Sequence, residues 1–461
     1  MERSCDTIAA ISTAASPGGI GIVRISGDSA IFIAKRLFHQ KNPIIWSEWK
    51  GNEARVGSIR GTQLAENESL DACVCLLFRA PKSYTCEDVV EFHCHGGTLV
   101  LRRVLLAVLA AGARAAAPGE FTRRAFLNGR IDLAQAEAVM RLVGAQTEQA
   151  ARAAKANLSG TLSRRIEAVR STLTHLAAEI AAWVDYPEDM PVALQPARLG
   201  AAITAAISDI NELTQKSEAM APIAEGVETV LLGRPNVGKS TLMNHLLGYD
   251  RSIVTEFAGT TRDTVSEMLQ FGNLSLRLID TAGICAADDP IEREGVARSR
   301  AAVASASLVF CLLDASRSLG TEDEALLREC DPMRTVLLCN KSDLGVKLHL
   351  GDLKLRFRYV FCCSAKSGKG LEGLPDAAAA LLNVKEIMPW QGLLSTQRQF
   401  DCAKSAANAL LEAQNALLAG FPLDAVGICL EDAIQALLSL TGERASDAVV
   451  DAVFASFCVG K

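Results

Sequence analysis

The feature that most constrains this chain of 461 residues is the segment Gly233-Arg234-Pro235-Asn236-Val237-Gly238-Lys239-Ser240, which matches the pattern G-x-x-x-x-G-K-[ST]. In this pattern a strand leads into a loop whose backbone N–H groups cradle phosphates, and a helix follows. An apolar run at 227–232 precedes the loop, and residues of helical spacing follow it: Leu242, Met243, Leu246 and Leu247. We therefore predict that Lys239 reaches the β- and γ-phosphates of a nucleotide and that Ser240 ligates Mg²⁺.

Three further motifs follow the phosphate-binding loop, each at the end of an expected strand. Asp280-Thr281-Ala282-Gly283 closes the strand 274–278, and there Asp280 would hold Mg²⁺ through water while the Gly283 N–H meets the γ-phosphate. Asn340-Lys341-Ser342-Asp343 closes 336–339, and Ser364-Ala365-Lys366 closes 359–361. Asp343 can accept two N–H groups from guanine, whose other edge Asn340 can reach, and adenine would leave this carboxylate poorly paired. The four motifs together predict a guanine-nucleotide-binding domain.

Composition limits the remaining function classes. The chain is 49% hydrophobic and 22% charged, which is ordinary for a globular protein of two to four domains. Its formal net charge of −6 excludes nucleic-acid binding by bulk charge, so any such contact needs a local patch or a partner. Candidate patches are Arg102-Arg103, Arg123-Arg124 with Arg130, and Arg164-Arg165 with Arg170; for the first and third, a solvated helix face is the favoured interpretation.

The scattered cysteines indicate the cellular compartment that we expect. Fourteen cysteines in a large nucleotide-binding chain favour buried free thiols in a reducing cytosol over a disulfide scaffold. The sequence shows no N-terminal signal and no apolar run of about 18 residues, so we expect a cytoplasmic protein without a membrane segment.

The order of expected elements predicts an inserted domain. Residues 1–121 combine short strands with a helix at 99–111, and residues 122–220 are helical, with a buried seam of apolar residues from Ile166 to Trp183. The nucleotide domain is expected at 221–384, and helices resume at 385–461, where Gly442 and Ser446 stand at cap positions. Because helices flank one compact α/β domain, we predict that the flanking segments pack as one helical domain.

Motifs outside the nucleotide domain carry a family resemblance that spans nearly the whole chain. They are the segments Gly19–Gly27, Glu87–Glu91 with His95-Gly96-Gly97, Pro118–Ala138, and the terminal Phe457-Cys458-Val459-Gly460-Lys461. With the four nucleotide motifs, the chain resembles the tRNA modification GTPase family called MnmE or TrmE. The resemblance implies an α/β and α fold: an N-terminal α+β folate-binding-like domain that also dimerises, a central helical domain, and an inserted Ras-like P-loop GTPase domain.

The resemblance also implies an activity and partners. Family members hydrolyse GTP with Mg²⁺ and K⁺, and they carry a one-carbon tetrahydrofolate. The implied reaction adds a carboxymethylaminomethyl- or aminomethyl-type group at C5 of the wobble uridine of certain tRNAs. The implied assembly is a homodimer that forms a heterotetramer with an FAD- and NADH-dependent MnmG-like subunit. The alternative from another class is a GTP-regulated ribosome-assembly or RNA-binding switch protein.

Site residues follow from matching the family motifs to this chain. The resemblance places folate contacts at Arg24, Glu91, Arg130 and Lys461. It places Mg²⁺ ligands at Ser240 and Thr261, and K⁺ ligands at Asn236, Thr255, Phe257 and Thr260. The predicted GTP-binding residues are Asn236, Val237, Gly238, Lys239, Ser240, Thr241, Thr255, Glu256, Phe257, Ala258, Gly259, Thr260, Thr261, Asp280, Thr281, Ala282, Gly283, Asn340, Lys341, Asp343, Ser364, Ala365 and Lys366.

The catalytic group is less directly indicated. Ile284 stands where Ras-like enzymes carry the glutamine that orients water, so another residue must do this. The resemblance assigns that role to Glu292, with Glu294 as a close competitor. No arginine finger is evident in the chain, and a monovalent cation held partly by Asn236 would supply the missing positive charge.

Several cysteines leave alternatives open. Cys458 is either a reactive thiol near the folate or a structural residue of a docked C-terminus. Cys73 and Cys75 alternate on an expected strand, which favours burial over a metal site formed with neighbouring cysteines and histidines. Cys86, Cys94 and Cys285 depart from the family pattern, in which the first two positions are Gly and the third is Arg. If Cys86 or Cys94 needs a positive φ, the side chain strains the folate pocket.

Overall fold

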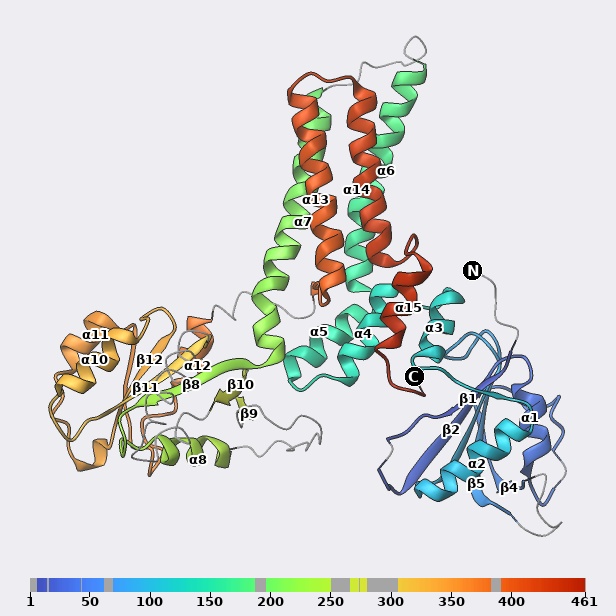
Figure 1. Cartoon of the computed structure of the whole chain (residues 1–461), viewed down its shortest axis with the longest axis horizontal. Helices are drawn as coiled ribbons and strands as arrows, with labels where there is room; N and C mark the ends of the chain where they lie inside the picture. The colour runs from blue at the N-terminus through green and yellow to red at the C-terminus, as the bar shows by residue number, and fades with distance from the viewer. Residues whose placement is uncertain are drawn as a thin grey trace, which may run out of the picture. The chain divides into compact units, whose positions relative to one another are not determined.

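The computed structural model describes residues 6–14, 16–42, 44–61, 69–186, 196–249, 266–272, 274–279, 306–382 and 391–460 (Figure 1). The chain divides into two compact units. The first unit comprises Met1–Met140, Ser163–Ala206 and Thr396–Lys461, and the second comprises Arg141–Leu162 and Ile207–Ser395.

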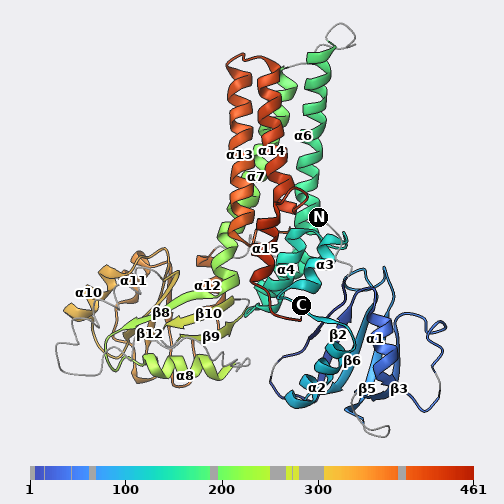
Figure 2. The same ribbon diagram turned by 45° about the vertical axis from the view of Figure 1, so that its right-hand side comes forward.

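A seven-stranded sheet forms the N-terminal part of the first unit, in the order β3-β4-β5-β6-β2-β1-β7. Every neighbouring pair is antiparallel except β1 and β7. Two helices, α1 (Ala30–Leu37) and α2 (Thr98–Ala110), cover one face of this sheet (Figures 1 and 2). The strands are β1 (Ile8–Ile11), β2 (Ile20–Ser26), β3 (Phe38–His39), β4 (Glu53–Ile59), β5 (Asp71–Phe78), β6 (Val89–His95) and β7 (Arg114–Ala115).

Period-two alternation assigns each strand residue to one face of this sheet. Val23 and Ile25 of β2 and Phe92 of β6 are buried in the core beneath α1 and α2. Their neighbours Arg24 and Glu91 therefore lie on the opposite face, where polar groups meet. Cys73 and Cys75 are both buried in the same core, as their alternation predicted.

Helices make up the rest of the first unit. The predicted seam lies in α6 (Thr161–Asp185) and is buried from Ile166 to Ile180, while Trp183 is only half-buried. Gly442 ends α14 with a φ of +93°, and the Ser446 side chain caps α15, so both cap predictions are confirmed. The helices of the chain from α3 to α7, and those after the nucleotide domain, are α3 (Glu120–Leu127), α4 (Leu133–Val143), α5 (Glu148–Leu158), α6 (Thr161–Asp185), α7 (Pro196–Glu225), α13 (Gln397–Leu418), α14 (Leu423–Thr441) and α15 (Asp447–Ala455).

Segments from both sides of the nucleotide domain pack together in the first unit, as expected for an insertion. Gln414 of α13 donates to Thr204 of α7 at 2.7 Å, and Gly427 of α14 lies against Ile180 of α6. Pro222 lies inside α7, which continues to Glu225. A proline inside a helix removes one internal hydrogen bond and crowds the carbonyl four residues earlier, but buried Met220 and Ile223 hold that end of α7 in the core of the second unit.

A six-stranded sheet forms the nucleotide domain, in the order β13-β12-β11-β8-β10-β9, and only β9 pairs antiparallel. Its elements are β8 (Val227–Gly233), α8 (Lys239–Tyr249), β9 (Ser266–Phe271), β10 (Leu274–Ile279), β11 (Leu308–Asp314), α10 (Thr321–Glu329), β12 (Thr335–Asn340), η2 (Ser342–Leu344), α11 (Leu350–Arg356), β13 (Tyr359–Cys362) and α12 (Leu374–Leu381). Parallel strands bring their carboxyl ends to one edge of a sheet, so the predicted motif loops gather there.

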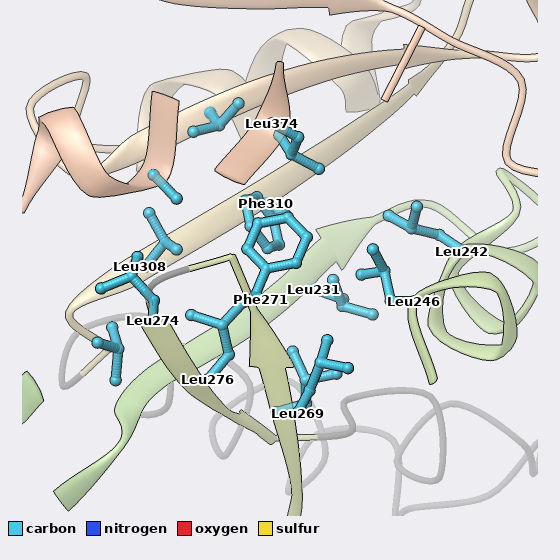
Figure 3. Close-up of a cluster of buried hydrophobic side chains, with 14 of the residues drawn as sticks. Leu231, Leu242, Leu246, Leu269, Phe271, Leu274, Leu276, Leu308, Phe310 and Leu374 are labelled. Atoms are coloured by element: carbon cyan, nitrogen blue, oxygen red, sulfur yellow. The ribbon is translucent and has the colours of Figure 1, made fainter. Parts of the chain in front are cut away.

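Two apolar layers hold this sheet between helices. One layer joins β8, β10 and β11 to α8 and α12 through residues such as Leu231, Phe310, Leu242 and Leu374 (Figure 3). The other layer joins the sheet to α10 and α11 through Leu327 and Leu353. No helix among the described residues combines the length and apolar character needed to cross a membrane.

Candidate functional site

The phosphate-binding loop leaves β8 and enters α8 through backbone conformations that favour glycine. Asn236 has a φ of +60° and Gly238 a φ of +103°. A Cβ atom on Gly238 would lie 2.3 Å from the Asn340 Nδ2 atom. Only glycine therefore fits at this position, because the loop passes directly against the Asn340 side chain.

Lys239 and Ser240 begin helix α8, at the end where backbone N–H groups attract anions. The Lys239 ammonium donates to the carbonyls of Gly233 and Arg234, at 2.6 and 3.0 Å. These bonds fold the side chain back against its own loop. The side chains of Ser240 and Thr241 are exposed.

Asn340 ties three of the motif segments together. It is 3% exposed, and its Nδ2 atom donates to the Val237 carbonyl at 2.8 Å. Its Oδ1 atom accepts from the Ala365 N–H, also at 2.8 Å. One buried amide side chain therefore fixes the phosphate-binding loop, the end of β12 and the loop after β13 in one arrangement.

Lys341 is held by an acidic group that sequence reasoning missed. Its ammonium donates to Asp314 Oδ2 at 2.8 Å, and the Ser316 hydroxyl donates to Asp314 Oδ1 at 2.6 Å. Burial alone would raise the pKa of Asp314, but these hydrogen bonds outweigh it and hold the pKa at about 2. The signal that could have found Asp314 is the apolar run 308–313 that it ends.

The loops after β12 and β13 carry the residues that the sequence predicts to bind the base. Asp343 lies within η2 and is exposed, so its carboxylate is accessible to the two guanine N–H groups that the sequence assigns to it. Ser364 and Ala365 are buried, whereas Lys366 is exposed.

Some predicted residues lie outside the described part of the chain. They lie at 255–261, at 280–292 and at the extreme C-terminus, and their assignments stay predictions: Thr255, Glu256, Phe257, Ala258, Gly259, Thr260, Thr261, Asp280, Thr281, Ala282, Gly283, Glu292 and Lys461. Cys285 lies outside it as well.

A second polar group lies on the face of the N-terminal sheet opposite α1 and α2. Arg24 and Glu91 are paired residues of β2 and β6, and Arg24 Nε donates to Glu91 Oε1 at 2.8 Å. His93 Nε2 lies 3.1 Å from the other carboxylate oxygen of Glu91. The guanidinium carbon of Arg24 lies 5.9 Å from the Tyr84 ring centroid and 5.5 Å from that of Phe121. A cation, a carboxylate and two aromatic rings thus share one place.

Arg130 reaches this place through the segment 83–87. It donates to the Ser83 carbonyl, while Asn128 Nδ2 donates to the Thr85 carbonyl at 2.7 Å. Cys86, in the same segment, has a φ of +60°, a conformation that L residues other than Asn and Asp rarely adopt. Cys94 differs, because it is buried in extended strand β6. Of the two expected departures, only Cys86 stands where glycine would relieve strain.

Arg124 of α3 forms a buried ion pair with Glu87 of the segment 83–87. Its side chain is 4% exposed, and its terminal nitrogens lie 2.7 Å from Asp6 Oδ1, 3.2 Å from Glu87 Oε1 and 3.2 Å from Glu120 Oε1. Burial raises the pKa of Glu120, but hydrogen bonds from Arg114 and Arg124 and from the Ala117 N–H lower it overall. Sequence reasoning treated Arg124 only as part of a surface patch, and the structure shows it inside the fold.

The C-terminal segment docks on the N-terminal sheet. The Gly119 N–H donates to the Cys458 carbonyl at 3.3 Å. Gly460 has a φ of +97°, and a Cβ atom there would lie 2.2 Å from the Ile11 carbonyl oxygen at the end of β1. The Cys458 side chain is exposed. The docked C-terminus that the sequence allowed is therefore present, and a reactive role for Cys458 stays a prediction.

The polar groups of both candidate sites suit the ligands that the sequence predicts for them. Arg24 can pair with a carboxylate, and Glu91 can accept N–H groups of a pterin edge. The loop amides before Lys239 suit phosphate. No group of three His, Cys, Asp or Glu residues within the described ranges is arranged to hold a metal ion.

Comparison with known proteins covers the whole chain. A model of the MnmE helical domain matches residues 133–458, and a model of the GTP-binding protein TrmE N-terminus matches residues 7–130. A tRNA modification GTPase MnmE from Heliobacterium modesticaldum is 39% identical over 99% of both chains. One from Synechococcus sp. (strain RCC307) is 42% identical over 99% of this chain and 98% of its own. The G domain of the T. maritima FeoB iron transporter covers 34% of this chain and 98% of its own, at 26% identity and a TM-score of 0.27. The full-length matches show that this chain belongs to the MnmE family of tRNA modification GTPases.

Proposed function

We propose that this protein hydrolyses GTP and uses the reaction in the modification of tRNA. The observation that carries the proposal is the full-length identity of 39% to a relative named tRNA modification GTPase MnmE. The finer proposal is addition of an aminomethyl- or carboxymethylaminomethyl-type group at C5 of the wobble uridine. Cytoplasmic tRNA is the substrate, and an FAD- and NADH-dependent MnmG-like subunit is the partner.

GTP binding follows from the arrangement of the described loops. The N–H groups before α8 receive the phosphates, and Lys239 exchanges the carbonyls of Gly233 and Arg234 for phosphate oxygens. Asp343 accepts guanine N–H groups, while Asn340 keeps the base loop and the phosphate loop in register. Mg²⁺, when bound through Ser240 and Thr261, supplies charge neutralisation at the β- and γ-phosphates.

Hydrolysis needs a group that orients water and a positive charge near the phosphates. We assign the first role to Glu292. Potassium, held in part by the Asn236 side chain, supplies the second when it is bound. Asn236 has a positive φ and is exposed in the phosphate-binding loop, which leaves its amide oxygen available. Thr255, Phe257 and Thr260 complete this proposed set of ligands.

The polar group around Arg24 and Glu91, on the sheet face opposite α1 and α2, is the proposed place for one-carbon tetrahydrofolate. Glu91 orients the pterin edge, Arg24 and Arg130 attract the carboxylate tail, and Lys461 closes the site from the C-terminus. The docking of Gly460 against Ile11, a residue paired with Val23 of β2, supports a C-terminus close to this face. We further propose a homodimer, which joins the MnmG-like subunit in a heterotetramer.

The decisive experiment is nucleoside analysis of tRNA from a strain that lacks this protein. We expect the modified wobble uridine to disappear and an unmodified or partly modified uridine to accumulate, as measured by mass spectrometry. Restoration by the wild-type gene is the control. A wobble uridine that is unchanged in the deletion strain contradicts the proposed tRNA modification.

A second experiment tests the potassium proposal separately. GTP hydrolysis by the full chain is measured in KCl and in NaCl at equal ionic strength. We expect faster hydrolysis in KCl, and we expect Asn236→Ala to remove the difference while nucleotide affinity is retained. Equal rates of the wild-type protein in both salts contradict a potassium site.

A further inference from the structure

The sequence contains three basic patches, and in the structure their arginines differ in the groups that they contact. Arg123 pairs with Asp451 at 2.9 Å, Arg124 is buried among carboxylates, and Arg130 donates to the Ser83 carbonyl. Arg170 pairs with Glu167. The patch at Arg102 and Arg103 is different, because neither residue has a carboxylate partner among the described residues.

Helices α1 and α2 present their outer sides to solvent with a shared pattern. On α2, the exposed residues Leu99, Arg102, Arg103 and Leu106 recur at i, i+3, i+4 and i+7, so they form one stripe. On α1, the exposed residues are Phe32, Lys35 and Arg36 at i, i+3 and i+4. The opposite sides of both helices are buried against the sheet. We call these seven exposed residues the α1–α2 basic face.

The two stripes form one surface. Helices α1 and α2 contact each other over the same face of the sheet (Figure 2). Arg36 Nη1 donates to the Ala111 carbonyl at 3.2 Å, which is the cap of α2, and the Arg36 guanidinium lies 6.0 Å from the Phe32 ring. A cation at a helix C-terminus is favoured by the helix dipole, so Arg36 is held in place beside α2.

Charge on this face has one sign. Neither helix contains an Asp or Glu residue, although the whole chain carries a net charge of −6. A face with four exposed cations and no carboxylate in its helices is complementary to a polyanion.

We infer that the α1–α2 basic face binds the phosphate backbone of tRNA. The identity of the polyanion rests on the proposed function, which makes tRNA the substrate. An anionic membrane fits less well, because the exposed apolar residues are separated by cations and form no continuous band that could enter a bilayer. Phe32, 59% exposed, offers a ring on which an unpaired base can stack, which suits RNA.

This surface acts as an anchor and not as part of the reacting site. Arg24 and Glu91 lie on the opposite face of the same sheet. Phosphate contacts fix the position of a nucleic acid without reading its sequence. The face therefore holds tRNA by charge, with little dependence on which tRNA is bound.

The test uses the full-length protein and an unmodified tRNA transcript. Its affinity is measured by fluorescence anisotropy between about 50 and 200 mM KCl, for the wild-type protein and for Arg102→Glu/Arg103→Glu. We expect an affinity loss of about tenfold or more at low salt. We also expect the slope of log affinity against log salt to become shallower by about 2, one unit for each lost phosphate contact.

Arg328→Glu/Lys354→Glu is the matched control, because it reverses two exposed cations in the nucleotide domain and changes the net charge by the same amount. It should leave affinity and slope close to wild-type values. Arg102→Gln/Arg103→Gln is a milder variant that should show the same change in slope if the glutamate variant folds poorly. Basal GTP hydrolysis should be unchanged in all three.

Two outcomes overturn the inference. One is an affinity for tRNA and a salt slope that stay unchanged in both α2 variants. This result would overturn the inference even if the same variants bound an acidic protein or anionic vesicles more weakly. The other is an equal loss in the control, which would show only an effect of net charge. Failure of the proposed function looks different, because wobble uridines would be unchanged in the deletion strain whatever the affinities are.

Discussion

The two candidate sites of this chain are held together in opposite ways. In the nucleotide domain, one neutral buried amide, Asn340, links loops through backbone carbonyl and N–H groups. On the N-terminal sheet, the segment 83–87 is supported by charged groups, with Arg124 among three carboxylates. A neutral brace costs little to bury once its hydrogen bonds form, whereas buried ions need every partner present.

The difference teaches where each site is sensitive to substitution. Loss of the neutral amide leaves two uncharged backbone groups unsatisfied. Loss of the central cation leaves carboxylates in a poorly solvated place, where the remaining charges repel each other. We therefore expect stability to respond most strongly at the N-terminal site and nucleotide affinity to respond most strongly at the other.

Arg124→Ala should give the largest loss of stability. The side chain is 4% exposed and faces Asp6, Glu87 and Glu120, so its removal should lower the free energy of unfolding of the first unit by about 3–5 kcal/mol. Chemical denaturation followed by circular dichroism measures this. Arg123→Ala is the control on the same helix, because its exposed pair with Asp451 should contribute less than about 1 kcal/mol. Equal effects of the two substitutions would remove the contrast between buried ions and a neutral brace.

Asn340→Ala should cause the second-largest loss of stability and the largest loss of GTP affinity. It leaves the Val237 carbonyl and the Ala365 N–H without their partner, which should cost about 2–3 kcal/mol in the second unit. GTP affinity should fall by about a hundredfold or more, because the loops lose their common arrangement. Titration calorimetry with GTP checks this, with Ser342→Ala as a control in the same motif. Near wild-type affinity for Asn340→Ala would show that the loops are fixed by other contacts.

The arrangement of the described nucleotide loops was predictable because its signals are local in the sequence. A fixed spacing around Lys239, and short motifs that close apolar runs, place Asn340 and Asp343 at the same sheet edge. The sequence analysis did not identify β11, so it also missed Asp314, which holds Lys341. No motif marks Asp314, and only the sheet order places it beside β12.

The N-terminal site was predictable only through family resemblance. Arg24 and Glu91 are far apart in sequence and meet because β2 and β6 pair in one register. Spacing within a single sequence does not determine such a register. For the same reason, no sequence pattern indicates that Arg124 is buried or that His93 lies against Glu91.

Asp314→Asn should produce a smaller effect that depends on pH. The folded pKa of Asp314 is lowered to about 2, so its ionised form contributes stability above its ordinary pKa, and this contribution is lost as the pH falls toward 2. The wild-type protein should exceed the variant in free energy of unfolding by about 1–2 kcal/mol from pH 5 to 7, and the difference should shrink below about pH 4. Urea denaturation at a series of pH values measures it. A difference that does not vary with pH would mean that the charge of Asp314 does not stabilise the loop through Lys341.

Cys86→Gly should give the smallest effect, and with the opposite sign. Cys86 has a φ of +60°, which costs an L residue about 1–2 kcal/mol, while glycine adds roughly 0.5–1 kcal/mol of unfolded-state entropy. The variant should therefore be more stable by about 0.5–1 kcal/mol. Cys94→Gly is the matched control, because Cys94 is buried in an extended strand, so glycine there removes packing and should destabilise the protein. Thermal unfolding of both variants separates the two cases. If Cys86→Gly also destabilises the protein, then the contacts of the Cys86 side chain contribute more stability than its positive φ costs. In that case the segment 83–87 stores little backbone strain.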